Sequence, residues 1–423
     1  MRKNLRITLA LFVMLTITSL MFAAGQPEKT TAGSSVTTLE VWSRGEELKQ
    51  FVPGFESEHP TIKVNVTVIP DADMTPKLIT VIASGKGVPD LFMQEASYIT
   101  YLVEADLYTD LRQAPFNVEA YSNQIWPATL SVGTDSTGAV RALTWQSCPG
   151  SIIYRRDIAQ KYFGTDEPAR ITDQLSTDAK FLTVAERMKQ DGVRIVSSFK
   201  DLFDMKVAAR TKPWVVEGKL VIDSALLAYM DMAKNIIGKG YDLGVDQWTP
   251  EWIAAVEADD MFSYVLPSWG YQYVVKPGAN TTSGKWAIAA PPVPYISGGS
   301  YMGIYKGTQK KEAAWEFLKY VTLNEESQYA YAKASGDYVS LKAVNERLAK
   351  EKGEAVLGGQ NPYEIYNVEM AGSFNKLNTI YDSQLNNAFI SAVKAYAEGK
   401  SKEQALNQFK ADVLNAFPEI IVE

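Results

Sequence analysis

The stretch of sequence that decides the fold is Thr38–Met93, which reads TLEVWSRGEELKQFVPGFESEHPTIKVNVTVIPDADMTPKLITVIASGKGVPDLFM. Short apolar runs and one alternation of apolar and polar residues predict three strands in it, at 38–42, 62–68 and 91–93. Apolar residues recur at helical spacing in 48–55 and in 77–84, and we expect the second helix to end at Gly85. Strands that alternate with helices in this way indicate an α/β fold with a parallel sheet covered by helices.

The ends of these strands are the first candidate positions for a binding site. In open α/β sheets, ligands bind just beyond the carboxyl ends of the strands. Those positions hold Trp42-Ser43-Arg44, then residues 69–73, then Gln94-Glu95. The C-terminal quarter of the chain is instead expected to be helical, at 312–321, 385–396 and 401–414.

Length and composition fit a globular protein with two lobes. The chain has 423 residues, too many for one small domain, and its 46% hydrophobic and 22% charged residues are typical of a folded chain. Its 42 basic residues against 49 acidic residues give a net charge of -7. Because a nucleic-acid partner requires a basic surface, this balance argues against nucleic acid as a partner.

The chain contains a single histidine, His59, and a single cysteine, Cys148. Ser-His-Asp and Cys-His catalytic sites need a histidine base, and a structural zinc site needs about four Cys or His ligands. Asp71 and Asp73 resemble part of a calcium loop, but the required glycine and closing glutamate do not follow. Metal sites made wholly of oxygen ligands and catalysis by carboxylates alone remain compatible with this composition. We expect no metal and no cofactor.

The first two dozen residues have the layout of a secretory signal peptide. A basic start at 1–6 precedes an uncharged, mostly apolar run that closes with the small residues Ala23-Ala24-Gly25. We interpret 1–24 as a cleaved signal peptide and 25–35 as a flexible leader, with a membrane anchor as the alternative, because about 18 such residues can just span a bilayer. No cysteine for lipid attachment follows the run. We expect the protein to be free in the periplasm or outside the cell.

Several segments, taken in order, carry a family resemblance. The most specific is Ile82-Ala83-Ser84-Gly85 followed by Val88-Pro89-Asp90-Leu91-Phe92. The others are Leu39-Glu40-Val41-Trp42 with 51–60, Ile153-Tyr154-Arg155-Arg156-Asp157, Met261-Phe262 with Pro267-Ser268-Trp269, 286–292 with Gly298-Gly299-Ser300-Tyr301, and 311–318. Together they resemble the extracellular solute-binding proteins of ABC importers, in the large family typified by maltose-binding protein. The resemblance covers nearly all of the chain from Val36 onward, although 165–220 matches nothing distinctive.

The resemblance implies a two-lobed periplasmic-binding-protein fold of type II. Lobe 1 would take residues 36–147 plus 293–336, and lobe 2 would take 148–292 plus 337–423. Hinge crossovers would join the lobes, and a ligand would bind in the cleft between them. Hinge motion would then close the lobes on the ligand.

The residues themselves point to a site of aromatic rings and polar side chains. A sugar presents apolar C–H patches that rings can cover and hydroxyl groups that charged and amide side chains can bind. Core packing is the alternative for each ring, and a solvated surface pair is the alternative for Arg44 and Glu95. The candidates at strand ends, crossovers and turns are Trp42, Arg44, Asp73, Glu95, Trp145, Gln146, Trp269, Tyr271, Tyr301 and Tyr338.

The leading hypothesis is a monomeric receptor that captures a mono- or oligosaccharide and delivers it to a membrane permease of an ABC importer. One alternative is a secreted glycoside hydrolase, with Glu95 and Asp73 as the paired carboxylates. Another is a binding protein for a non-sugar solute such as a polyamine or glycerol-phosphate. Iron fits poorly, because His59 is the only imidazole.

Overall fold

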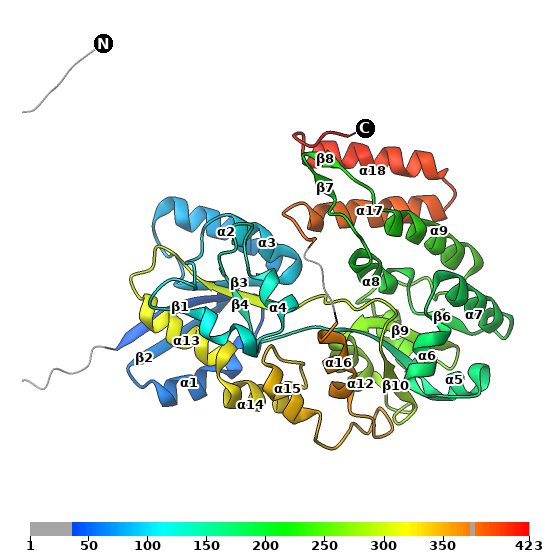
Figure 1. The fold of residues 1–423 in the computed structure, drawn as a ribbon, viewed down its shortest axis with the longest axis horizontal. Coiled ribbons are helices and arrows are strands. Elements are labelled where there is room, and N and C mark those ends of the chain that lie inside the picture. Colours follow the sequence, from blue (N-terminus) through cyan, green and yellow to red (C-terminus); the bar gives the residue numbers. More distant parts are fainter. Residues whose placement is uncertain (1–35, 373–376, 423) are drawn as a thin grey trace, which may run out of the picture. The chain divides into compact units, whose positions relative to one another are not determined.

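The computed structural model describes residues 36–372 and 377–422. The predicted signal peptide, 1–24, and the predicted leader, 25–35, lie outside the described residues. The chain from Val36 onward forms one compact unit with two main sheets, each covered by its own helices (Figure 1). This arrangement confirms the expected α/β fold class.

The first sheet has the strand order β2-β1-β3-β11-β4. β1 (Thr37–Ser43) runs parallel to β2 (Ile62–Val68) and to β3 (Leu91–Glu95), so the three predicted strands are confirmed. β11 (Ser300–Ile304) returns antiparallel between β3 and β4 (Leu143–Thr144). The carboxyl ends of β1, β2 and β3 therefore meet at one edge of this sheet.

The two helices that connect these strands differ in extent from the prediction. The predicted helix 48–55 is split into a short 3-10 turn, Glu47–Gln50, and α1 (Val52–Glu58). α2 (Asp71–Ser84) begins earlier than expected, with Asp71 and Asp73 in its first turn, where carboxylates stabilise a helix. It ends at Gly85 as predicted, and Gly85 adopts the left-handed conformation with φ 64° that favours glycine.

The second sheet has the strand order β10-β5-β9-β6. β5 (Gly150–Arg155) pairs antiparallel with β9 (Met261–Pro267) and with β10 (Trp286–Ala289), whereas β6 (Arg194–Val196) runs parallel to β9. The carboxyl ends of β6 and β9 thus share an edge, which mirrors the situation in the first sheet.

Helices from distant parts of the chain cover the second sheet. α7 (Asp178–Gln190) packs against β6, and α9 (Ser224–Lys239) packs against α17 (Asp382–Ala397). α17 and α18 (Lys402–Ala416) form a pair beside α9 (Figure 1). α18 begins with the capping box of Ser401 and Gln404. Residues of these helices and of the second sheet share one buried cluster.

One predicted lobe boundary differs from the packing. Val339, Leu341, Val344 and Leu348 are buried in the same cluster as Leu39 and other residues of the first sheet. The prediction placed 337–423 in the second lobe, but the apolar face of α15 (Lys342–Leu348) is covered by the first lobe. The chain therefore joins the second lobe only after α15, since Tyr366 and Met370 on α16 (Pro362–Met370) pack in a cluster of the second lobe.

Two crossover segments, 145–149 and 290–299, run antiparallel between the sheets. Pro149 forms an isolated bridge with Ile296, and the backbone N–H of Gly150 donates to the carbonyl of Tyr295 at 2.7 Å. A Cβ on Gly150 would lie 2.1 Å from the Tyr295 ring, so only glycine allows this close approach. The crossovers are held in register where the lobes join.

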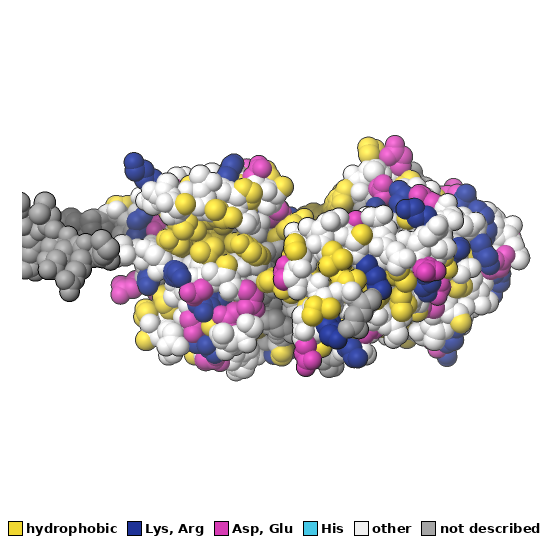
Figure 2. Space-filling view, turned by 90° about the horizontal axis from the view of Figure 1, so that it is seen from above, with side chains coloured by type: hydrophobic (Ala, Val, Ile, Leu, Met, Phe, Trp, Pro, Cys, Tyr) yellow, Lys and Arg dark blue, Asp and Glu magenta, His cyan; other side chains and the backbone are white. Residues whose placement is uncertain are grey.

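The surface of the described residues includes an apolar area over α2 and α3 (Ala96–Glu104). Seen from above, hydrophobic side chains gather on the lobe that carries these helices (Figure 2). Ile79, Tyr98 and Tyr101 are its large exposed members. No helix within 36–372 and 377–422 is both long enough and apolar enough to cross a membrane.

Candidate ligand-binding site

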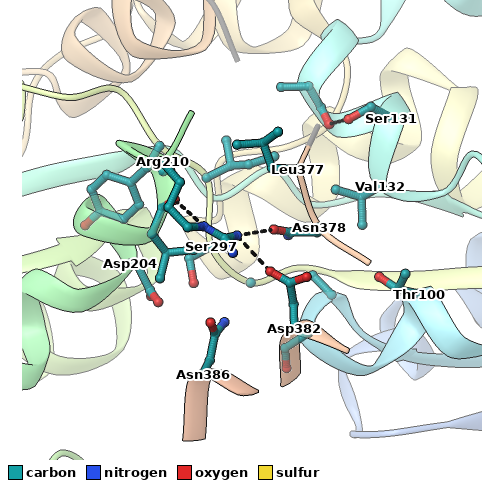
Figure 3. A pocket seen from close by; sticks show the side chains of 18 of the residues that line it. Thr100, Ser131, Val132, Asp204, Arg210, Ser297, Leu377, Asn378, Asp382 and Asn386 are labelled. Carbon is teal, nitrogen blue, oxygen red and sulfur yellow. Dashed lines mark hydrogen bonds and ion pairs between the residues drawn. The ribbon is translucent and has the colours of Figure 1, made fainter. Parts of the chain in front are cut away.

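A cavity of about 240 Å³ opens where the carboxyl edges of the two sheets approach each other. The first lobe contributes the start of α3 and α4 (Pro127–Val132), and the crossover contributes residues 293–298. The second lobe contributes α8 (Phe203–Ala208), Arg210 and the start of α17. Figure 3 shows polar side chains from these elements around the cavity. Its position matches the rule that α/β sheets bind ligands beyond their carboxyl ends.

Three charged residues meet at the carboxyl ends of β1, β2 and β3. Arg44 Nε donates to Asp71 Oδ2 at 2.8 Å, and the backbone N–H of Glu95 donates to Asp71 Oδ1 at 3.3 Å. The Glu95 side chain caps α3 by accepting hydrogen bonds from the backbone N–H (2.8 Å) and hydroxyl of Ser97. Burial raises the pKa of Glu95, while the Ser97 hydrogen bonds and the charge of Arg44 oppose that rise. Of the predicted binding residues, only Glu95 lines the cavity, and Arg44 is near enough to Glu95 to act on it through its charge.

A buried ion pair forms the opposite wall. Arg210, only 3% exposed, donates from Nη2 to Asp382 Oδ1 at 2.7 Å and to Asn378 Oδ1 at 3.4 Å (Figure 3). Its Nε donates to the carbonyl of Val207 at 3.0 Å. Asp382 also accepts from the backbone N–H and hydroxyl of Thr379 at 2.8 and 2.9 Å. The buried Nη1 of Arg210 has no hydrogen-bond partner among the described residues, and Arg210 lines the cavity.

Asp204 on α8 is a second carboxyl group in the wall of the second lobe. Burial raises its pKa, and a hydrogen bond with the side chain of Ser297 on the crossover opposes the rise. Asn386 on α17 accepts from Trp214 Nε1 at 2.8 Å through its oxygen, so its amide nitrogen is left for other partners. Asp204, Ser297 and Asn386 lie around the same space (Figure 3).

A pair of indole rings stands beside the crossover. Trp269 follows β9 and donates from Nε1 to the carbonyl of Ser297 at 3.1 Å, so it neighbours the cavity wall. Trp248 stacks on it with 5.3 Å between ring centroids and 26° between ring planes. Trp248 is 59% exposed and has a φ of 67°, which is uncommon for a bulky residue. Such strain persists only where the surroundings hold the residue, and it is concentrated at functional sites.

Three other predicted residues lie outside the cavity wall. Trp42 is half-buried at the end of β1, and Asp73 is exposed in the first turn of α2. Gln146, on a crossover, donates to Asp337 Oδ2 at 2.6 Å and accepts from the backbone N–H of Ser300 at 3.2 Å. Tyr273 of the second lobe donates to the same Asp337 at 2.7 Å. The side chain of Gln146 thus ties together segments where the lobes join.

Four of the predicted rings lie in the core, which differs from the expected position in a cleft. Trp145 is fully buried against Phe51 in the first lobe. Tyr301 on β11 faces inward and donates to the carbonyl of Thr129 at 3.0 Å. Tyr338 and Tyr271 are buried in one cluster of the second lobe. Tyr271 begins a π-helical segment, Tyr271–Val275, rather than lying in a turn, and all four side chains are buried in the packed interior.

Sequence reasoning missed the wall of the second lobe. Arg210 and Asp204 lie within 165–220, which carries no distinctive motif, and Asp382 opens a helix whose pattern indicates only packing. Trp248 could have been found, because it precedes Thr249-Pro250 and follows Gly244 in a loop, the same kind of context that singled out Trp269. No three His, Cys, Asp or Glu side chains in the described part of the chain are placed to hold a metal ion.

A buried carboxyl group on α16 leads to a prediction about pH. Glu369 is 4% exposed, its Oε2 has no partner among the described residues, and burial raises its pKa from 4.5 to about 8. Between these two values the folded protein holds a proton that the unfolded chain has released. The free energy of unfolding therefore falls as the pH rises through this interval, and the loss is complete above about pH 8.

Glu369→Gln is expected to raise the free energy of unfolding by about 3–4 kcal/mol at pH ~8.5, because it removes the buried charge that the folded protein has to carry above a pKa of about 8. Near pH 5 the two proteins should differ little. Urea unfolding at both pH values measures this, with the exposed Glu364→Gln on the same helix as a control. Parallel pH profiles for the wild type and Glu369→Gln would contradict the assignment.

Comparison with known proteins identifies one matching protein family and several similar solved structures. The family of bacterial extracellular solute-binding proteins matches residues 50–355. Among solved structures, a crystal structure of an extracellular solute-binding protein of family 1 has a TM-score of 0.79 at 19% identity, over 90% of this chain and 99% of that chain. A comparison with curated proteins finds no match.

Two further structures are similar over almost the whole chain. The galacto-N-biose-/lacto-N-biose I-binding protein of the ABC transporter from Bifidobacterium longum, in complex with lacto-N-biose, has a TM-score of 0.72 at 18% identity, over 92% of this chain and 99% of that chain. The sugar-binding protein MalE from Xanthomonas citri has a TM-score of 0.73 at 16% identity, over 90% and 98%. At these identities the similarity shows a shared two-lobed fold.

Proposed function

Because this chain belongs to the bacterial extracellular solute-binding proteins, we propose that it captures a mono- or oligosaccharide for an ABC importer. The observation that carries the proposal is the cavity, which collects polar side chains from the carboxyl edges of two separate sheets and has an indole beside it. The similar proteins that bind lacto-N-biose and other sugars support the same ligand class.

The chemistry of the wall suits hydroxyl groups. Glu95 and Asp204 accept hydrogen bonds, and the unpartnered Nη1 of Arg210 donates one. Hydrogen bonds that involve a charged partner are stronger than neutral ones. Trp269 offers an apolar ring to a C–H face of a sugar, with Trp248 stacked against it. A polyhydroxylated solute with apolar faces satisfies both kinds of group.

The mechanism is closure of the lobes around the ligand. Residues 145–149 and 290–299 join the sheets, and a ligand that contacts both walls favours the closed arrangement, because it binds that arrangement more tightly. A membrane permease would then recognise the closed, monomeric receptor in the periplasm or outside the cell. The exposed apolar area on α2 and α3, with Ile79, Tyr98 and Tyr101, is a type of surface that protein partners cover.

The test is titration of the purified protein with a panel of neutral mono- and disaccharides, followed by tryptophan fluorescence and melting temperature. At least one sugar is expected to shift both signals, since a ligand that binds only the folded state raises its stability. If no sugar shifts either signal, the proposal fails. Sustained release of reducing sugar from a glycoside would instead favour the hydrolase alternative.

A further inference from the structure

The charges that line the cavity are unbalanced. Among the described lining residues, three are acidic, Glu95, Asp204 and Asp382, and one is basic, Arg210. Arg210 and Asp382 are 2.7 Å apart and both buried, so together they present little net charge to a ligand. The charge that a ligand meets therefore comes from Glu95 and Asp204.

These two carboxyl groups face the cavity from different lobes. Glu95 ends β3 of the first sheet, and Asp204 lies on α8, which follows β6 of the second sheet. Within 36–372 and 377–422, neither of them has a Lys or Arg nitrogen within 4.0 Å. The cation that acts on Glu95, Arg44, is itself paired with Asp71 at 2.8 Å. A ligand held between the lobes thus lies between two carboxyl groups that have no close cation among the residues that the structure describes.

An anionic group on the ligand would be repelled from both sides. Charge interactions are strong inside a site of low dielectric, because little water screens them. The one lining guanidinium offers limited compensation, since Asp382 and Asn378 already occupy its Nη2. Hydroxyl groups meet no such repulsion, because they donate to the carboxylates and accept from Nη1 of Arg210.

We propose that the site selects neutral sugars over sugar acids, and that Asp204 is a specificity-determining residue that excludes carboxylated ligands from the wall of the second lobe. This inference rests on the proposed function, because it concerns the ligand of the same cavity. It adds a ligand class that the fold alone does not specify.

The experiment compares matched pairs of ligands by calorimetric titration. The probes are galactose with galacturonate, glucose with glucuronate, and α-1,4-galactobiose with α-1,4-digalacturonate, together with spermidine and glycerol 3-phosphate. For any pair that binds, the wild-type protein is expected to prefer the neutral member by at least tenfold. Asp204→Asn is expected to reduce the ratio of the affinities for the neutral and the acidic ligand about tenfold, because it removes the charge and keeps the shape of the side chain.

Two variants control for trivial effects. Asp259→Asn removes the same charge from the second lobe at a side chain that is 95% exposed and does not line the cavity, so the preference should stay at its wild-type value. Glu95→Gln tests the first lobe independently, should Asp204→Asn fold poorly, and is expected to narrow the preference in the same direction. Melting temperatures of each variant without ligand identify any loss of folding.

The outcomes separate this inference from the proposed function. Preferential binding of a neutral sugar supports both, and binding of spermidine alone supports the charge selection but overturns the sugar receptor. If a sugar acid binds as tightly as its neutral partner or more tightly, the charge selection is wrong but the sugar-receptor function stands. If only glycerol 3-phosphate binds, or if no probe binds, both the charge selection and the sugar-receptor function are wrong. A preference that Asp204→Asn and Glu95→Gln leave unchanged overturns the assigned roles.

Discussion

Arg210→Met is expected to lower the free energy of unfolding by about 3–5 kcal/mol, because it leaves Asp382 buried without its cation. The two side chains are 1% and 8% exposed, and Nη2 and Oδ1 are 2.7 Å apart. Methionine fills part of the volume, so the loss comes mainly from the uncompensated carboxylate. Urea unfolding monitored by far-UV circular dichroism measures it, and the midpoint should shift to clearly lower urea.

Two comparisons isolate the buried charge as the cause. The double variant Arg210→Met/Asp382→Asn removes both charges and is expected to recover about half of the loss, since an asparagine oxygen can still accept from Thr379. Arg347→Met breaks an exposed pair with Glu326, at 3.0 Å and 50% and 78% exposure, and should cost less than about 1 kcal/mol. Equal losses for Arg210→Met and Arg347→Met would show that burial of Asp382 carries no energetic consequence.

Local patterns in the sequence were sufficient to predict the three parallel strands of the first sheet, but not its antiparallel strands β11 and β4. The alternation in 62–68 and the apolar run at 91–93 are signals within single segments, and the structure has strands at Ile62–Val68 and Leu91–Glu95. The lobe boundary near residue 337 could not be predicted from local patterns. α15 has the same kind of apolar face as the helices of the second lobe, and only the tertiary packing of Val344 and Leu348 assigns it to the first. Periodicity shows that a face is buried, without showing what covers it.

The residues of the candidate site also fall into those that local sequence signals can locate and those that only the tertiary structure locates. Arg44 and Glu95 could be placed at one edge of the sheet from the sequence, because the carboxyl end of a parallel strand can be recognised there. Trp145 was chosen at an expected crossover and Tyr301 after a glycine turn, but both side chains are buried in the core, because the direction of a side chain depends on the backbone of its neighbours. Arg210, with its partner Asp382 in a segment 172 residues later, gives no local signal, since neither residue type nor spacing relates them.

Trp269→Ala is expected to weaken sugar binding by about 2–4 kcal/mol, or roughly thirty- to thousandfold, because a half-buried indole beside a cavity is typical of residues that dominate binding energy. Two effects contribute. The ring supplies apolar area to the ligand, and its Nε1 holds the carbonyl of Ser297 on the crossover that lines the cavity. Calorimetric titration measures the affinity without depending on the fluorescence of the ring that is removed.

Trp269→Phe separates these two effects, since it keeps an aromatic face but cannot donate to Ser297. An affinity between those of the wild type and the alanine variant is expected if stacking provides most of the binding energy. Tyr396→Ala, at a half-buried ring on α17 that does not line the cavity, controls for the general loss of an aromatic side chain and should keep wild-type affinity. Wild-type affinity in Trp269→Ala, together with an unchanged melting temperature, would mean that the indole contacts no ligand and that the binding energy resides in the polar walls alone.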